Sequence, residues 1–158
     1  MPLSNETVVR AEELGLTFQT NDGPVTALTG VSLDIRKGDF VSFIGPSGCG
    51  KTTFLRIIAD LEQPTAGRIS VNGMTPEQAR KARAYGYVFQ AAALYPWRTI
   101  EKNIALPLEI MGFSSAEKKE RIERTLALVN LSGFGRHYPN QLSGGMQQRA
   151  SIARALAF

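Results

Sequence analysis

Apolar and polar residues alternate in two stretches of the chain, and this period of two predicts half-buried β-strands. The stretches are VSLDI at 31–35 and RISVNG at 68–73. The turn-forming residues TNDGP at 20–24 precede the first, and Asn-Gly closes the second, which is a hairpin signal. The apolar, β-favouring run FVSFI at 40–44 predicts a buried strand, and YGYVFQ at 85–90 predicts another.

Helical spacing of apolar residues begins at Lys51. The stretch KTTFLRIIADL carries apolar side chains at Phe54, Leu55, Ile57, Ile58 and Leu61. This spacing predicts an amphipathic helix over 51–61. Pro64 and Gly67, within the following EQPTAG, are expected to end it.

The second half of the chain is mainly helical in pattern. A long helix is expected from Ser114 or Ser115, with Ile122, Leu126 and Val129 on one face. Ser114 and Glu117 fit a capping box, and Glu117 and Arg121 fit an i,i+4 ion pair. Another helix is expected after Ser143, a residue type that favours the N-cap position.

Composition narrows the class of protein. Of the 158 residues, 43% are hydrophobic and 20% charged, which is typical of a soluble globular domain or part of one. No apolar run is long enough to span a bilayer, and the N-terminus lacks the pattern of a secretion signal. The single cysteine, Cys49, cannot form an internal disulfide, consistent with a reducing compartment. The net charge of +4 is spread along the chain without a dense basic block, so nucleic acid is not an expected partner.

The segment GPSGCGKTT at 45–53 fits the phosphate-loop pattern G-x-x-x-x-G-K-[ST] in full, between an expected strand and an expected helix. Glycines let backbone N–H groups turn towards an anion, and the helix N-terminus favours negative charge. Lys51 can reach the terminal phosphates, and the Thr52 hydroxyl can coordinate Mg²⁺. The sequence therefore predicts a binding site for a nucleoside triphosphate.

Two further motifs identify a family. The segment LSGGMQQR at 142–149 closely resembles the signature sequence of ABC ATPases, and VFQ at 88–90 resembles their Q-loop. With the phosphate loop, all three lie in the family's order. The chain thus resembles the N-terminal portion of the ATP-binding subunit of an ABC transporter of the importer type.

This resemblance implies roles for particular residues. Phe18 lies where the family places an aromatic that stacks on adenine, although it could be an ordinary strand-end aromatic. Gln90 would contact Mg²⁺ and the attacking water, although it could be a polar residue at a strand end. Ser143, Gly144 and Gly145 would contact ATP held by a second subunit. The expected cofactors are ATP and Mg²⁺, with Thr52 and Gln90 as metal contacts. The expected nucleotide contacts are Phe18, Gly45, Pro46, Ser47, Gly48, Cys49, Gly50, Lys51, Thr52 and Thr53.

The resemblance also implies partners. The stretch after the Q-loop, with LYPWRT and NIALPLE, looks like that of the nitrate/sulfonate/taurine importers. In importers this region docks on the membrane permease, so Trp97 is an expected permease contact. A Trp buried in the helical subdomain is the alternative. The chain would act at the cytoplasmic face of the cell membrane, as a dimer with a second ATP-binding subunit and, indirectly, with a solute-binding protein. His137, Arg149 and Arg154 are given no chemistry.

The expected fold is α/β, of the P-loop NTPase type. A β-rich part with the phosphate loop covers about 1–90, a helical subdomain about 91–142, and the signature with its helix 142–158. The sequence ends before the segment in which the family carries its Walker B Asp, catalytic Glu and switch His. We therefore expect missing C-terminal core strands and no hydrolysis by these residues alone. A soluble ABC ATPase of DNA repair or translation, or a nucleotide-binding fragment without activity, is the alternative function.

Overall fold

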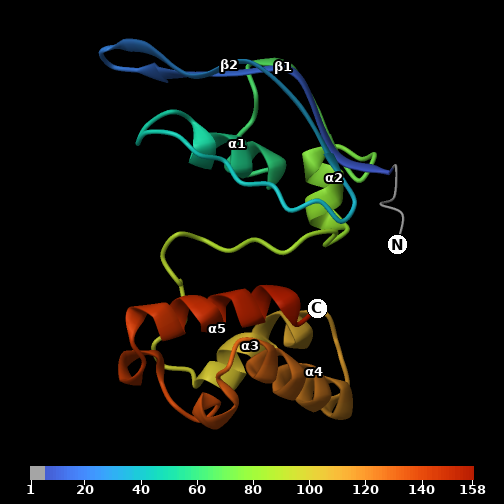
Figure 1. Ribbon diagram of the computed structural model, residues 1–158, viewed down its shortest axis with the longest axis vertical. Helices are drawn as coiled ribbons and strands as arrows, with labels where there is room; N and C mark the ends of the chain where they lie inside the picture. Colours follow the sequence, from blue (N-terminus) through green and yellow to red (C-terminus); the bar gives the residue numbers. More distant parts are fainter. Residues whose placement is uncertain (1–5) are drawn as a thin grey trace. The chain divides into compact units, whose positions relative to one another are not determined.

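A computed structural model describes residues 6–158 and divides the chain into two units, one ending at Tyr85 and one beginning at Gly86 (Figure 1). The first unit contains β1 (Thr7–Thr20), β2 (Gly23–Arg36), α1 (Lys51–Ile58), β3 (Ala66–Val71) and α2 (Pro76–Lys81). The second contains α3 (Ile100–Ile110), α4 (Ser115–Leu128), α5 (Gly144–Leu156) and the short 3₁₀ helices η1 (Ser132–Phe134) and η2 (Pro139–Gln141). The signature helix therefore folds with the helical unit.

The first unit is built on an antiparallel sheet of order β2-β1-β3. The two long strands form a hairpin whose turn falls at residues 21–22, as TNDGP predicts. The strand expected at 31–35 is the second half of β2, so that prediction is confirmed. The strand expected at 68–73 is β3, but it pairs with β1 and not with a following strand. Its Asn-Gly pair forms a tight turn that leads into α2.

A bulge in β1 changes which side chains point into the core. The register shifts between Ala11 and Leu14, and Glu13 lies between them with a positive φ of 48°. Before the bulge the buried residues are Val9 and Ala11, and after it they are Leu14 and Leu16. The inserted residue thus reverses the alternation, which is why the sequence of β1 does not show one simple period.

Helix α1 packs against this sheet through its apolar face. Phe54 and Ile57 are buried in one cluster with Leu14, Leu16 and Leu28. Burial of these side chains stabilises the unit by about 1.5–3 kcal/mol for each large one. The helix ends at Ile58, earlier than its expected end at residue 61, because Asp60 adopts a left-handed conformation with φ of 53°. The packing fixes the helix, and with it the loop that feeds its first turn.

The second unit has its own core where α3, α4 and α5 meet, and Leu131 and Leu142 contribute from the connecting loops. Each helix begins with a capped turn: Thr99, Ser114 and Ser143 accept hydrogen bonds from the backbone N–H three residues later. The predicted capping box at Ser114 and the predicted cap at Ser143 are confirmed. Caps of this kind stabilise a helix by about 1 kcal/mol.

The pair predicted between Glu117 and Arg121 does not form as a direct ion pair. The Arg121 guanidinium lies over the Phe113 ring, 4.5 Å from its centroid, and donates to the carbonyl of Ala157 at 3.1 Å. Glu117 instead receives bonds from the Ser114 hydroxyl and N–H, which lower the pKa of this carboxyl together with a smaller attraction to Arg121.

Two predicted strands are absent from the described residues. Segment 40–44 forms no strand, and Phe40 and Ile44 are each 95% exposed. Segment 85–90 forms no strand either. A parallel strand is stable only between neighbours that pair with its backbone, and no described segment does so for either stretch. The prediction of a buried strand at 40–44 is therefore wrong for this structure, and so is that of a strand at 85–90.

We expect Gly67→Ala to destabilise the first unit strongly. Gly67 has φ of 74°, and a Cβ there would overlap the backbone of Glu13 at the bulge. The loss combines about 1–2 kcal/mol for the left-handed conformation with a further penalty for the overlap. Chemical denaturation would measure it.

Gly73→Ala is the matched control. Gly73 has a similar φ of 72° but nothing within 4 Å of an added Cβ. Equal losses in the two variants would contradict the close approach at Gly67.

Candidate functional site

The phosphate loop leads into a helix N-terminus without a side-chain cap. Gly50 is the N-cap of α1, with φ of 90°, and the first turn contains no acidic residue. A Cβ at this position would lie 2.6 Å from the Ala27 carbonyl oxygen and from the Leu28 side chain, so only glycine fits. The first N–H groups of the helix are therefore left for an anion, where the macrodipole also favours negative charge.

The Lys51 ammonium folds back over this loop. It donates to the carbonyl oxygens of Gly45 at 2.8 Å and Pro46 at 2.7 Å, and it lies 3.4 Å from the sulfur of Cys49. None of the carboxylates in the described part of the chain forms an ion pair with it. The loop therefore holds a cation that is neutralised only by backbone dipoles, an arrangement suited to a polyphosphate.

The other predicted nucleotide contacts of the first unit lie in the loop, in the first turn of α1 and, for Phe18, on β1. Thr52 is exposed and Thr53 half-buried in the first turn of α1, and Ser47 and Gly48 are exposed in the loop. Phe18 lies near the end of β1, paired with Val25 of β2, and is 36% exposed. An edge-to-face contact between Phe43 and Phe54, with centroids 5.4 Å apart, ties the segment before the loop to α1.

The second unit carries Gln90 on an exposed, irregular segment. Two side chains of α5 hold that segment. Gln148 donates to the Phe89 carbonyl at 3.2 Å, and Arg154 donates to the carbonyls of Ala93 at 2.9 Å and Ala92 at 3.4 Å. The segment flanking Gln90 is thus attached to the signature helix.

The signature residues form the start of α5. Ser143 accepts from the Met146 N–H at 3.3 Å, and Gly144 and Gly145 are exposed in the first turn. Gln147 donates to the carbonyls of Pro139 and Leu142 at 2.9 and 3.1 Å, which fixes the loop before the helix. The exposed N-terminal turn offers N–H groups to an acceptor outside this unit.

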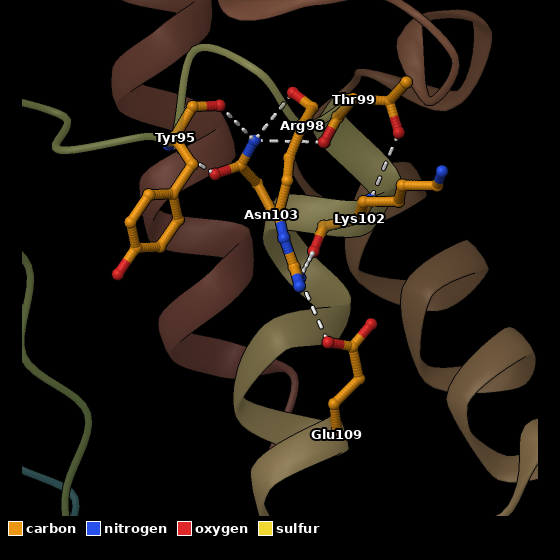
Figure 2. A network of polar contacts seen from close by, with 6 residues as sticks. All are labelled: Tyr95, Arg98, Thr99, Lys102, Asn103 and Glu109. Carbon is orange, nitrogen blue, oxygen red and sulfur yellow. Dashed lines mark hydrogen bonds and ion pairs between the residues drawn. The ribbon is translucent and has the colours of Figure 1, made fainter.

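Trp97 is exposed at 71% and rests against Tyr95, with ring centroids 5.1 Å apart. The alternative of a Trp buried in the helical core is therefore wrong. Asn103 of α3, fully buried, holds this loop (Figure 2). Its Oδ1 accepts from the Tyr95 N–H at 2.7 Å, and its Nδ2 lies 3.0–3.1 Å from the carbonyls of Tyr95, Arg98 and Thr99.

Sequence reasoning missed Asn103, Gln148, Arg149 and Arg154. Arg149 donates to the Val129 carbonyl at 2.9 Å and so covers the C-terminus of α4, where cations are favourable. Arg154 is half-buried, and burial lowers the pKa of its guanidinium. Their positions in the sequence could have indicated these roles. Asn103 lies among apolar residues of α3, and the other three are long polar side chains on the alanine-rich helix α5. Their partners are backbone carbonyls, which a sequence pattern does not reveal.

Three aspartates that could have served as catalytic carboxylates have structural partners. Asp34 pairs with Arg10, and Asp39 accepts from the Arg36 N–H. Asp60 is buried beside Arg80, whose hydrogen bond of 2.8 Å contributes most to lowering the pKa of that carboxyl. The described residues contain no group of three or more His, Cys, Asp or Glu side chains that could hold a metal.

Comparison with known sequences decides the family. The profile described as "ABC transporter" matches residues 28–158.

The chain belongs to the ABC transporter family. An uncharacterized ABC transporter ATP-binding protein of Methanocaldococcus jannaschii is 44% identical over 149 residues, which cover 94% of this chain and 55% of that protein. The methionine import ATP-binding protein MetN 3 of Shouchella clausii is 42% identical, over 95% of this chain and 46% of its own length. The Fe(3+) ions import ATP-binding protein FbpC of Brucella suis is 48% identical, over 85% of this chain and 38% of its own length.

Solved structures agree on the fold. The dimeric, post-hydrolysis state of the ATP-binding cassette MJ0796 bound to ADP and Pi matches with a TM-score of 0.85 and 39% identity, covering 94% of this chain and 69% of that one. The structure of cbiO1 from Clostridium perfringens, described as part of the ABC transporter complex cbiONQ, matches with a TM-score of 0.82 over 97% of this chain and 62% of that one. Its identity to this chain is only 23%, so it supports the fold alone. The predicted ABC nucleotide-binding fold is confirmed.

The chain spans about half the length of the curated relatives it matches, between 38% and 58% in those compared. Within residues 6–158, no helix combines the length and apolarity needed to cross a bilayer. A probable sulfate/thiosulfate import ATP-binding protein, CysA of Chlorella vulgaris, is 47% identical over 85% of this chain and 58% of its own length. The import proteins compared are thus named for sulfate or thiosulfate, methionine and Fe(3+), and the resemblance to the nitrate/sulfonate/taurine group stays a prediction.

Proposed function

We propose that this chain is the nucleotide-binding part of an ATP-binding subunit that couples ATP binding and hydrolysis to solute import. The observation that carries the proposal is the α1 N-terminus, uncapped and open to an anion, with the Lys51 ammonium held inside the loop. It is supported by relatives that are import ATP-binding proteins and by the ADP and Pi bound to a cassette of the same fold.

In this proposal each residue has a physical role. Loop N–H groups from Gly45 to Thr53 surround the phosphates, and Lys51 exchanges its two carbonyl partners for phosphate oxygens. Phe18 offers an aromatic face to adenine. The Thr52 hydroxyl would bind Mg²⁺, which neutralises charge on the phosphates, and Gln90 stays a predicted metal contact from the resemblance.

The second half of the proposal concerns partners. Ser143, Gly144 and Gly145 would contact ATP bound to another ATP-binding subunit, because their N–H groups face outward from an exposed helix start. The exposed Trp97 would contact the permease, since a large amphipathic ring is the type of residue that anchors protein interfaces. The subunit would then lie at the cytoplasmic face of the membrane, with a solute-binding protein delivering cargo to the permease.

Lys51→Ala is expected to weaken ATP binding by about 10- to 100-fold, because the charge-assisted bonds to phosphate are lost. Titration of a fluorescent ATP analogue in the presence of Mg²⁺ would measure the change. Lys81→Ala removes a cation from the same unit, one that pairs with Glu77 on α2. It should leave the affinity unchanged. Unaltered binding by Lys51→Ala would remove the loop from its assigned role.

Hydrolysis is a separate matter. We propose that the 158 residues alone bind ATP without turnover, because Asp34, Asp39 and Asp60 are engaged in structural contacts. Phosphate release from Mg·ATP should equal that of the Lys51→Ala protein. A release rate well above that baseline, lost in the Lys51 variant, would show that a catalytic carboxylate lies within these residues.

Trp97→Ala is expected to weaken association with the permease by about 30-fold, the loss typical of a central aromatic anchor, while ATP affinity stays the same. Co-expression with a candidate permease subunit, followed by pull-down in detergent, would test it. Leu128→Ala removes another side chain of this unit, 68% exposed, and serves as the control. Equal recovery of permease with the Trp97 and Leu128 variants would rule out docking through Trp97.

A further inference from the structure

The loop around Trp97 has no regular structure of its own, yet it is fixed from two helices. Asn103 of α3 contacts the backbone of three of its residues, as Figure 2 shows. Arg154 of α5 holds the carbonyls of Ala92 and Ala93 just before it. Both side chains bond backbone groups of the loop. They therefore fix the loop conformation and leave its exposed side chains without a bond to either residue.

The bonds of Asn103 are fully used. This side chain is 0% exposed, and its single acceptor and its two amide hydrogens all point at loop backbone groups. A buried amide is costly unless it is paired, so this packing is stable only with the loop in its present shape. The Arg98 guanidinium adds a bond to the Lys102 carbonyl and an ion pair with Glu109, both on α3.

Arg154 makes the same kind of contact from the other side. It is half-buried, and no carboxylate of the described chain pairs with it. A guanidinium removed from water in this way depends on the carbonyl acceptors that the loop supplies. The loop and the arginine therefore stabilise each other.

We propose that Asn103 and Arg154 are positioning residues that pre-organise residues 92–99 for the permease, so that little conformational entropy is lost when Trp97 docks. This inference rests on the proposed function, because it assumes that Trp97 is the docking residue. The order of the loop can be measured independently of that assumption, because the proposal requires the loop to be ordered before any partner binds. Pre-organisation improves affinity by removing the cost of ordering an interface.

The experiment uses Trp97 itself, since it is the only tryptophan of the chain. Time-resolved fluorescence anisotropy of the full chain reports how freely its ring moves on the nanosecond scale. Asn103→Asp keeps the size of the side chain but turns a carboxylate oxygen towards three carbonyls. We expect the amplitude of fast depolarisation to rise about twofold, as expected when a fixed side chain gains rotamer freedom. Permease association should fall by roughly 3- to 10-fold.

Asn140→Asp, at an exposed position of the same unit, is the control and should change neither quantity. Arg154→Lys provides a second variant in case Asn103→Asp fails to fold, which far-UV circular dichroism would reveal. This variant keeps the positive charge and most of the aliphatic chain, but it lacks the second guanidinium nitrogen needed to reach the carbonyls of both Ala92 and Ala93. Unchanged Trp97 motion in a folded Asn103→Asp or Arg154→Lys protein would overturn the proposal.

The outcomes separate this proposal from the proposed function. If Trp97→Ala weakens permease association while the positioning variants leave both motion and association unaltered, docking stands and pre-organisation is wrong. If the positioning variants loosen Trp97 but Trp97→Ala leaves association intact, the loop is ordered for another purpose and the docking assignment fails. If loosening occurs without any loss of association, pre-organisation for the permease is overturned.

Discussion

The left-handed conformation of Gly50 is the constraint on which the candidate phosphate site depends. Gly50 has φ of 90°, and the Ala27 carbonyl and Leu28 leave no room for a Cβ. The loop can therefore end and α1 begin at this one residue. A residue with a capping side chain would satisfy the helix N–H groups itself and would remove the attraction for an anion. The sheet beneath α1 completes the arrangement, because burial of Phe54 and Ile57 fixes where that N-terminus lies.

The second unit follows a different principle, in which side chains of helices bond the backbone of loops. Gln148 and Arg154 hold the segment beside Gln90, Asn103 holds the loop of Trp97, and Arg149 covers the end of α4. Such bonds fix backbone position and leave the exposed side chains of the loop available for partners. Three of these side chains belong to α5, which therefore ties the segment beside Gln90 and the end of α4 to one helix.

Much of this could be predicted from the sequence, and the failures have physical causes. Local signals were sufficient for the start of α1 at Lys51, for the cap at Ser114 and for the cap at Ser143, because each depends on neighbours within a few residues. Segment 40–44 has the composition of a buried strand, but a strand also needs partners, and none of the described segments pairs with it. Asn103 and Arg154 bond backbone groups, which every residue has, so their partners leave no mark in the sequence. For Arg154 those partners also lie about sixty residues away along the chain.

The bulge at Glu13 has a consequence for how the family can vary in length. Since the inward-facing positions are odd-numbered before it and even-numbered after it, β1 acts as two short strands joined out of phase. Loss of a single residue within either half would carry part of β1 to the solvent side of the sheet, whereas loss of one between Ala11 and Leu14 would remove the bulge and leave both halves facing the core. Insertions and deletions in related chains should therefore gather in the hairpin turn at residues 21–22, where a change of length leaves both core faces in place.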